Sequence, residues 1–276
     1  MPAEAPKLSG IPILGFGTYP LSGAAGRTAI EMALEVGFRH IDTAQMYGNE
    51  AEVGRAIAAS GLKQSEVFVT TKVNGGNLGV GRFLASVRES LDHLQMRCVD
   101  LLLIHWPPGD ASEIEPAIDR LNQAAEDGLA ARIGVSNFPV AYLQRAVTRS
   151  ARKLVNNQVE FHPFLDQTKL LKAAAGLGLS LSAYCPLARG TVLTHPVVKT
   201  IAERLGEPAS AVVLRWIIQQ GVIPVPMTTW RANAKANLRA LGITLGDEDM
   251  ASISSLTVTN RRFVSPGNMS ALWDRP

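Results

Sequence analysis

Short apolar runs alternate with longer amphipathic segments along the whole chain, and this alternation constrains its fold more than any other feature of the sequence. Each run is rich in β-branched residues and short enough for a strand, while the segments between the runs have helical periodicity. Such alternation is typical of βα units, whose strands form a parallel sheet. The eight predicted strands are residues 13–18, 38–43, 67–72, 99–105, 131–137, 154–160, 179–185 and 222–227.

The segments between the strands contain signals for where helices begin and end. Residues 82–96 place their apolar side chains on one stripe, as an amphipathic helix does. Asn49, followed three residues later by Glu52, is typical of a capping box and predicts a helix that begins there. Gly37 and Gly128 occur where two helices are predicted to end.

Eight strands, each followed by a helix, predict an α/β fold of the (β/α)8 TIM-barrel type. We expect residues 1–276 to form a single domain, with a β-hairpin at residues 7–13 before the first barrel strand. A doubly wound open sheet is the alternative, but it requires a glycine-rich fingerprint after its first strand. The sequence there has Gly15 and Gly17 but Pro20 at the third glycine position. The barrel is therefore favoured.

Charge and composition exclude several classes of function. The 27 basic and 24 acidic residues give a net charge of +3 and are scattered along the chain, so no nucleic-acid partner is predicted. No run approaches the roughly 18 apolar residues of a membrane span, and the first residues lack the features of a signal peptide. Cys98 and Cys185 lie in apolar segments, which is typical of reduced thiols. We therefore expect a cytoplasmic protein that does not bind membranes.

Four side chains that can carry protons follow the second, third and fourth predicted strands. Asp42, Lys72 and His105 stand at strand ends, and Tyr47 follows in the loop after the second strand. The C-terminal ends of barrel strands form the active-site face, so the four side chains are expected to meet at one rim. Each residue alone also has a structural interpretation, as a strand-end cap, a solvated strand terminus, a core histidine or a packed aromatic. Together they favour a proton-transfer site.

The chemistry of these four residues is mutually consistent. A tyrosine has a pKa of about 10, and a buried ammonium beside it would lower that pKa by favouring the phenolate. Asp42 would keep Lys72 charged, and a neutral His105 could donate a hydrogen bond to a substrate carbonyl oxygen. Tyr47 would then deliver a proton to that oxygen. The histidines lack the spacing of metal ligands, so no metal site is predicted.

Six motifs in order resemble the aldo-keto reductase family across essentially the whole chain. They are HIDTAQMYGNEAEVG, VFVTTK, VDLLLIHWP, IGVSNF, NNQVEFHP and LSAYCPLARG, and the closing RRFVSPGNMSALWD is also similar. Within that family the chain is most similar to bacterial reductases of 2,5-diketogluconate and methylglyoxal. The resemblance implies a (β/α)8 barrel, a monomer, NADP(H) bound at the rim, and a catalytic set of Asp42, Tyr47, Lys72 and His105 with Tyr47 as proton donor.

The resemblance also implies which residues hold the nicotinamide. Ser136, Asn137 and Gln158 are expected to contact its carboxamide, and Tyr184 is expected to stack on its ring. The residue types suit these roles, because an amide needs paired donors and acceptors. An aromatic face can fix which side of a planar ring is presented to a substrate.

The segment VPMTTWRANAKANL departs from the family pattern for binding the 2′-phosphate of the cofactor. Met227 stands where the family usually has a lysine, and Asn233 stands where it has an arginine. Thr228, Arg231 and Asn237 remain to contact the phosphate and the adenine. Charge-assisted hydrogen bonds contribute about 1.5–3 kcal/mol each. We therefore expect binding of NADP(H) with weakened discrimination against NAD(H).

The substrate pocket is expected to differ from the family pattern on one side. Asn74 stands at a position often filled by a tryptophan, which predicts a wider and wetter wall. Tyr19, Trp106 and Phe138 are the aromatic candidates for the rest of the pocket. Trp273 either joins them or holds the C-terminal segment in place. This pocket favours small polar carbonyl compounds over steroids.

The leading hypothesis is an NADPH-dependent reductase of aldehydes, ketoaldehydes or small ketones. A non-catalytic nicotinamide-binding subunit that senses redox state is the alternative, although a binding protein has no need for an acid with a lysine beside it. A third hypothesis is an isomerase or aldolase that uses Lys72 as a Schiff-base nucleophile. It shares the barrel but does not account for the cofactor motifs.

Overall fold

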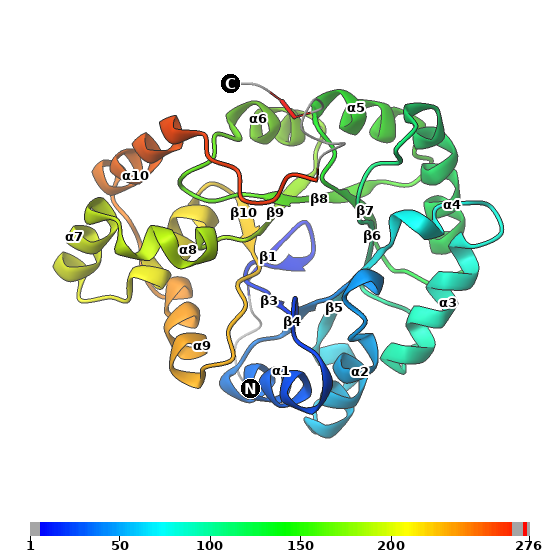
Figure 1. Cartoon of the computed structure of the whole chain (residues 1–276), viewed down its shortest axis with the longest axis horizontal. Helices are drawn as coiled ribbons and strands as arrows, with labels where there is room; N and C mark the ends of the chain where they lie inside the picture. Colours follow the sequence, from blue (N-terminus) through cyan, green and yellow to red (C-terminus); the bar gives the residue numbers. More distant parts are fainter. Residues whose placement is uncertain (1–5, 267–272, 275–276) are drawn as a thin grey trace.

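A computed structural model describes residues 6–266 and 273–274 of the chain. Its main sheet contains eight parallel strands, each hydrogen-bonded to its neighbour in sequence order, which curve around a common axis (Figure 1). The eight predicted strands are therefore confirmed, with ends that differ by a few residues. The strands are β3 (Phe16–Gly17), β4 (His40–Asp42), β5 (Phe68–Val73), β6 (Leu101–Ile104), β7 (Ile133–Ser136), β8 (Leu154–Glu160), β9 (Ser180–Tyr184) and β10 (Val222–Pro224).

Backbone hydrogen bonds connect the first strand of this sheet to the last. The Gly15 N–H donates to the Pro224 carbonyl at 2.9 Å, and the Gly17 N–H donates to the Pro226 carbonyl at 3.0 Å. A Cβ atom on Gly17 would lie 3.0 Å from the Val225 carbonyl oxygen, so glycine permits the close approach. These contacts close the sheet into the predicted (β/α)8 barrel.

The predicted N-terminal hairpin is also confirmed. Strands β1 (Lys7–Leu8) and β2 (Ile11–Pro12) pair antiparallel. The side chain of Ile11 is fully buried and packs with apolar side chains from β5, β6 and β10. The hairpin therefore contributes to the apolar core inside the barrel. It lies at the end of the barrel opposite the strand ends that carry the candidate site.

Helices follow the strands and surround the barrel (Figure 1). Two of them, α7 (Pro196–Leu205) and α8 (Ala209–Gln219), lie between β9 and β10, where a strict repeat predicts one. None of the helices in the described residues is both long enough and apolar enough to cross a membrane. The helices are α1 (Gly23–Val36), α2 (Glu50–Ala59), α3 (Phe83–Leu94), α4 (Ile114–Glu126), α5 (Val140–Arg149), α6 (Thr168–Gly176), α7 (Pro196–Leu205), α8 (Ala209–Gln219), α9 (Arg231–Leu238) and α10 (Asp247–Ser254).

The capping box predicted for α2 is wrong, although the helix does begin directly after Asn49. The Asn49 amide donates instead to the carbonyls of Thr18 and Leu21, at 3.0 and 2.8 Å. Its oxygen accepts a hydrogen bond from the Thr43 hydroxyl at 2.7 Å. A buried side chain with three tertiary partners is not available to cap a helix, and Glu52 consequently has no reciprocal role. Asn49 joins the loops that follow β3 and β4.

Gly54 allows α2 to pack closely on α3, and this contact can be tested. A Cβ atom at Gly54 would lie 2.7 Å from the carbonyl oxygens of His93 and Leu94. We expect Gly54→Ala to lower the free energy of unfolding by about 1–3 kcal/mol, the usual cost of overpacking. Gly176→Ala is the matched control, because that helical glycine has open space around it and alanine is the better helix former. Urea denaturation measures both; equal stability of the two variants would contradict the packing argument.

Candidate active site

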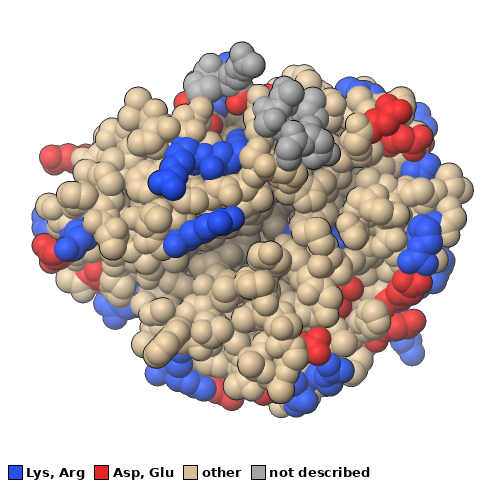
Figure 2. All heavy atoms as spheres, viewed as in Figure 1, with Lys and Arg blue, Asp and Glu red and all other residues tan. Residues whose placement is uncertain are grey.

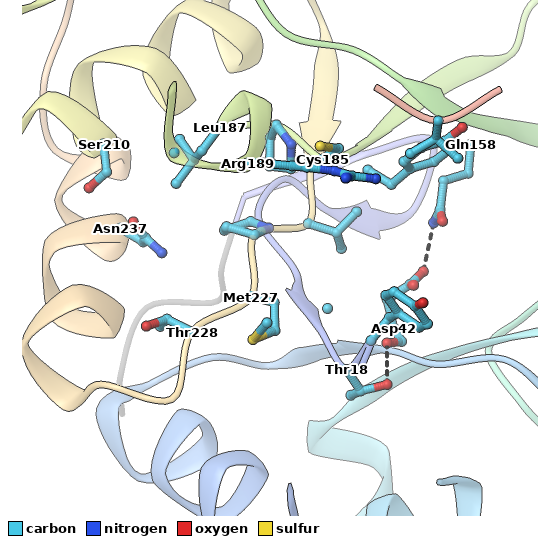
Figure 3. Close-up of a pocket in the computed structure, with 18 of the residues that line it drawn as sticks. Thr18, Asp42, Gln158, Cys185, Leu187, Arg189, Ser210, Met227, Thr228 and Asn237 are labelled. Atoms are coloured by element: carbon cyan, nitrogen blue, oxygen red, sulfur yellow. Dashed lines mark hydrogen bonds between the residues drawn. The ribbon is translucent and has the colours of Figure 1, made fainter. Parts of the chain in front are cut away.

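A cavity of about 970 Å³ opens at the carboxyl ends of the barrel strands. Figure 2 shows the hollow on this face, with Lys or Arg side chains beside it. Its walls come from strands β3, β4, β8 and β9, from the segments that follow β3, β4, β6, β7, β9 and β10, and from helix α9. In Figure 3, Asp42 and Gln158 lie at one end of the cavity, and Thr228, Ser210 and Asn237 lie toward the other. The cavity is therefore elongated.

A buried ion pair stands at the first end. Lys72 of β5 is fully buried, and its Nζ donates to Asp42 Oδ1 on the adjacent strand at 2.5 Å. The same Nζ donates to the Thr43 carbonyl at 2.8 Å. Burial lowers the pKa of Lys72. The Asp42 carboxylate and the Tyr47 hydroxyl together raise that pKa by more than burial lowers it, so the net shift is upward. Lys72 is therefore an ammonium ion at neutral pH.

The Asp42 carboxylate is fixed by a second partner from across the barrel. Gln158 of β8 donates its amide N–H to Asp42 Oδ2 at 2.6 Å, shown by a dashed line in Figure 3. Thr18 donates its hydroxyl to the Asp42 backbone carbonyl at 3.0 Å. Both carboxylate oxygens thus have a donor, which a buried charge requires.

Tyr47 lies above this pair. The Lys72 ammonium is 3.4 Å from the Tyr47 hydroxyl and 5.0 Å from the centre of its ring. Burial raises the pKa of Tyr47, and Lys72, which lowers that pKa, offsets burial only in part. The sequence-based expectation of a net lowered pKa is therefore corrected. The hydroxyl is protonated at neutral pH, and protonation is what a proton donor needs.

His105 completes the group at this end. Its ring is 5.6 Å from the Tyr47 ring, with the two planes nearly perpendicular. Burial, and then the nearby Lys72 charge, lower the pKa of His105 to about 3. The imidazole is therefore neutral at physiological pH, as the sequence analysis expected. A neutral imidazole can donate a hydrogen bond without competing with Tyr47 as an acid.

Polar side chains from three strand ends form the adjoining wall. Asn137 donates to the His105 carbonyl at 3.0 Å, and its Oδ1 accepts the Tyr184 hydroxyl at 2.8 Å. Asn137 has a φ of 63°, in the left-handed region that asparagine tolerates better than most residues. Asn137, Gln158 and Tyr184 all line the cavity. Ser136 is buried behind this wall, where its hydroxyl donates to the Gln158 carbonyl at 2.7 Å.

The far end of the cavity fits the adenosine part of a dinucleotide. Asn237 is buried and lines the cavity, and its Oδ1 has no hydrogen-bond partner within residues 6–266 and 273–274. Such an oxygen can accept the amino group of an adenine. Thr228 also lines the cavity, although its hydroxyl already accepts the Trp230 N–H at 3.1 Å. An elongated cavity with amides at both ends suits a nicotinamide dinucleotide.

Three predicted site residues lie away from the cavity, whereas Lys72 and Ser136, which do not line it either, are buried behind its wall. Phe138 is fully buried in the core and packs against Tyr142, because its strand end turns it outward from the barrel axis. Asn74 uses its backbone N–H to contact Gln45 and lies outside the cavity wall. Arg231 forms an ion pair with Glu35 of α1 instead of lining the cavity. The predictions for these side chains are corrected accordingly.

Tyr19 and Trp106 line the cavity beside Tyr47, as expected. The Tyr19 ring lies 5.1 Å from the Tyr47 ring. Trp106 follows His105 and contacts Trp273, with ring centres 6.2 Å apart. Aromatic side chains therefore form part of the wall at the Tyr47 end.

The sequence analysis missed Arg189, the one Lys or Arg among the described residues that line the cavity. It lies in the loop after β9, and Figure 3 shows it between the two ends of the cavity. Its guanidinium donates to the Phe263 carbonyl at 3.2 Å. The position of Arg189 in the segment that follows a barrel strand was a signal that could have identified it.

Comparisons with known proteins agree with this geometry. The model of the Aldo/keto reductase family matches residues 14–258. Methylglyoxal reductase DkgB of Yersinia pestis is 39% identical over 96% of this chain and 99% of its own. An aldo-keto reductase of Mycobacterium sp. (strain MCS) is 39% identical over 89% of this chain and 87% of its own.

Two solved structures extend these comparisons. The crystal structure of "a putative 2,5-diketo-D-gluconic acid reductase B" is 43% identical, has a TM-score of 0.93, and is matched over 97% of this chain and 95% of its own. Aldose reductase from Schistosoma japonicum is 30% identical with a TM-score of 0.89, over 95% and 93% of the two chains. The predicted family, bacterial type and barrel are thereby confirmed.

Lys72 and Asp42 form a buried ion pair, so removing one partner is expected to destabilise the protein. We expect Lys72→Met to lower the free energy of unfolding by about 3–5 kcal/mol, since Asp42 is left as an unpaired buried charge. Asp42→Asn combined with Lys72→Met should recover part of this loss. Exposed Lys172→Met is the control and should change little. Urea denaturation measures each variant; a Lys72→Met variant as stable as the control would exclude a buried charge pair.

Proposed function

The chain belongs to the aldo/keto reductase family and is an NAD(P)H-dependent oxidoreductase; from this premise we propose that it reduces aldehydes, ketoaldehydes or small ketones with NADPH, with Tyr47 as proton donor. The contact that carries the proposal is the Lys72 ammonium, held between the Asp42 carboxylate at 2.5 Å and the Tyr47 hydroxyl at 3.4 Å.

In the proposed mechanism each residue of the group has one role. Tyr47 is protonated and donates its proton to the carbonyl oxygen as negative charge develops there. Lys72 stabilises the resulting phenolate, and Asp42 keeps Lys72 positively charged and in place. Neutral His105 donates a hydrogen bond that orients the carbonyl oxygen toward Tyr47.

The cofactor would lie along the cavity. Bound NADPH supplies the hydride that reduces the carbonyl carbon. Asn137 and Gln158 would hold the nicotinamide amide, and Ser136 would fix Gln158 through the hydrogen bond to its carbonyl. Tyr184 would stack its aromatic ring on the nicotinamide ring. Asn237 and Thr228 would contact the adenosine end. Arg189, between the two ends, would face the phosphates with its positive charge, as a cation does in anion-binding sites.

The wall at the Tyr47 end bears on the choice of substrate, because the aromatic side chains of Tyr19 and Trp106 lie there beside polar groups. Two similar proteins are named as reductases of methylglyoxal and of 2,5-diketo-D-gluconic acid. We propose small, polar carbonyl compounds of this kind as substrates. Polar substrates also suit the hydrogen-bond donors at the centre of the site.

The arrangement of Lys72 disfavours the Schiff-base alternative. Schiff-base formation needs a neutral amine with a free lone pair, whereas Lys72 is fully buried, charged and bonded to Asp42. The sensor alternative differs from a reductase only in lacking turnover. An acid held beside an ammonium is costly to bury, which favours catalysis as its role.

Replacing the proton donor separates the reductase from the sensor. We expect Tyr47→Phe to reduce kcat by about a hundredfold or more, the usual range for a general acid. The phenyl ring preserves the packing against Tyr19, so the affinity for NADPH should change little. Reduced-nicotinamide absorbance with methylglyoxal measures turnover, and calorimetry measures cofactor binding. Turnover that survives in Tyr47→Phe means that another group is the acid; NADPH binding without turnover in the unaltered chain supports the sensor.

The wall near the adenosine end predicts weak discrimination between the two cofactors. Met227 and Asn233 line the cavity there, while Arg231 is paired with Glu35. We expect the ratio of kcat/KM for NADPH over NADH to lie below roughly a thousandfold, near 4 kcal/mol. Met227→Lys should raise the ratio by about tenfold or more, because one charge-assisted bond to the 2′-phosphate is added.

Val258→Lys is the matched control for this cofactor prediction. It adds the same charge at a highly exposed side chain outside the cavity wall. A ratio above a thousandfold in the unaltered chain, or an equal rise in both lysine variants, would contradict the assignment of this wall to phosphate recognition.

A further inference from the structure

Another buried carboxylate, at the end of β8, is unused by the proposed mechanism. The side chain of Glu160 is fully buried. Burying a carboxylate costs several kcal/mol unless donors surround it. The donors that surround Glu160 come from the C-terminal segment and from the turn after β8, and the contacts suggest that Glu160 does more than stabilise its own strand.

Two of its partners are backbone N–H groups of the C-terminal segment. Phe263 N–H donates to Glu160 Oε1 at 2.6 Å, and Val264 N–H donates to Oε2 at 2.9 Å. Consecutive N–H groups that bind the two oxygens of one carboxylate fix both the position and the direction of the segment. Figure 1 shows this segment, after α10, crossing the strand ends near β8 and β9.

His162, in the turn after β8, supplies a third hydrogen-bond donor to the Glu160 carboxylate. Phe164 N–H donates to His162 Nδ1 at 3.3 Å, so the ring proton of a neutral His162 is on Nε2. Nε2 lies 2.8 Å from Glu160 Oε1 and donates to it. The His162 ring also packs edge-on against the Phe263 ring, with centres 5.3 Å apart. The turn after β8 therefore supports both the carboxylate and the segment bound to it.

Arg262 connects Glu160 to the wall of the cavity. Its Nη1 is 4.0 Å from Glu160 Oε2, and its guanidinium lies 4.0 Å from the centre of the Trp273 ring. Trp273 contacts Trp106, which lines the cavity beside His105. Val264, bound directly by Glu160, also lines the cavity. Two separate routes thus lead from one buried carboxylate to the cavity wall, one through Val264 and one through Arg262 and Trp273 to Trp106.

We propose that Glu160 is a positioning residue that sets the affinity for the carbonyl substrate by holding Val264 at the cavity wall and, through Arg262, the Trp273 ring against the wall residue Trp106. The inference rests on the proposed function, since it concerns the substrate of that reaction. The side-chain contacts of Glu160 do not include Asn137, Gln158 or Asn237. The route from Glu160 to the cofactor is indirect, through the Phe263 carbonyl that accepts a hydrogen bond from Arg189 at 3.2 Å, so cofactor affinity should change less than the KM for the substrate.

The test compares four variants with the unaltered chain. Glu160→Gln keeps the shape but turns one acceptor into a donor that faces backbone N–H groups. Trp273→Ala removes the ring that packs against Trp106 of the wall, and the double variant tests whether Glu160 and Trp273 act together. Asp100→Asn is the matched control, because Asp100 also accepts a backbone N–H, that of Val69 at 2.9 Å, but stands at the start of β6, away from the cavity.

The expected result is a separation of KM from cofactor affinity. Glu160→Gln and Trp273→Ala should each raise the KM for methylglyoxal by about tenfold, because the wall that contacts the substrate is no longer held in position. The double variant should be no more than a few-fold worse than either single variant, since coupled residues are not additive. The dissociation constant for NADPH should stay within about twofold in Trp273→Ala and should change by less than the KM does in Glu160→Gln. Asp100→Asn should lower stability without changing KM.

Either of two results would overturn the inference. A Glu160→Gln variant with lowered stability and unchanged KM would make Glu160 purely structural, and fully multiplicative effects in the double variant would show that it does not act through Trp273. If Glu160→Gln does not fold, Arg262→Met replaces it, because Glu160 then keeps its two backbone donors. Arg262→Met should reproduce the KM of Trp273→Ala, and a normal KM would reject the proposal.

The same assays keep this inference distinct from the proposed function. Turnover by the unaltered chain, and its loss in Tyr47→Phe, test the reductase. The ratio of KM values among variants that do turn over tests Glu160. A working reductase with an unchanged KM in Trp273→Ala therefore rejects the positioning role alone.

Discussion

The buried contact between Lys72 and Asp42 is the interaction on which the rest of the site depends. A fully buried ammonium is tolerated only because the carboxylate lies at 2.5 Å and the Thr43 carbonyl accepts a second hydrogen bond. The pair in turn determines the state of its neighbours. The same positive charge lowers the pKa of Tyr47 and adds to the lowering of the pKa of His105, whereas burial acts on the two groups in opposite directions. The result is a protonated tyrosine beside a neutral imidazole.

The barrel provides the geometry that makes this pair possible. Parallel register sets Asp42 opposite Thr70, so Lys72 projects two residues farther along β5, on the same side of the sheet. Closure through Gly15 and Gly17 brings the last strand beside the first. Because all eight strands end at one rim, side chains from distant parts of the sequence enclose a single elongated cavity.

Strand β8 contributes to both halves of the site through residues two positions apart. Gln158 reaches across the barrel to Asp42, and Glu160 binds the backbone of the C-terminal segment at Phe263 and Val264. Alternate residues of a strand point to the same face. One strand can therefore fix both Asp42, through Gln158, and the part of the cavity wall at Val264, through Glu160. The proposed substrate position is thus defined by contacts to the same strand.

The sequence by itself determined the eight strands, the barrel and the residues that end each strand. Hydrophobic periodicity and the residue types at strand ends are local properties, so they can be recognised without knowing any tertiary contact. The tertiary structure alone decided where side chains in loops point. Asn49 bonds to neighbouring loops instead of capping its helix, Arg231 pairs with Glu35, and Arg189 lines the cavity. Likewise the net direction of the Tyr47 pKa shift depends on how burial compares with the Lys72 charge. Such outcomes follow from contacts between residues distant in sequence, which no local pattern specifies.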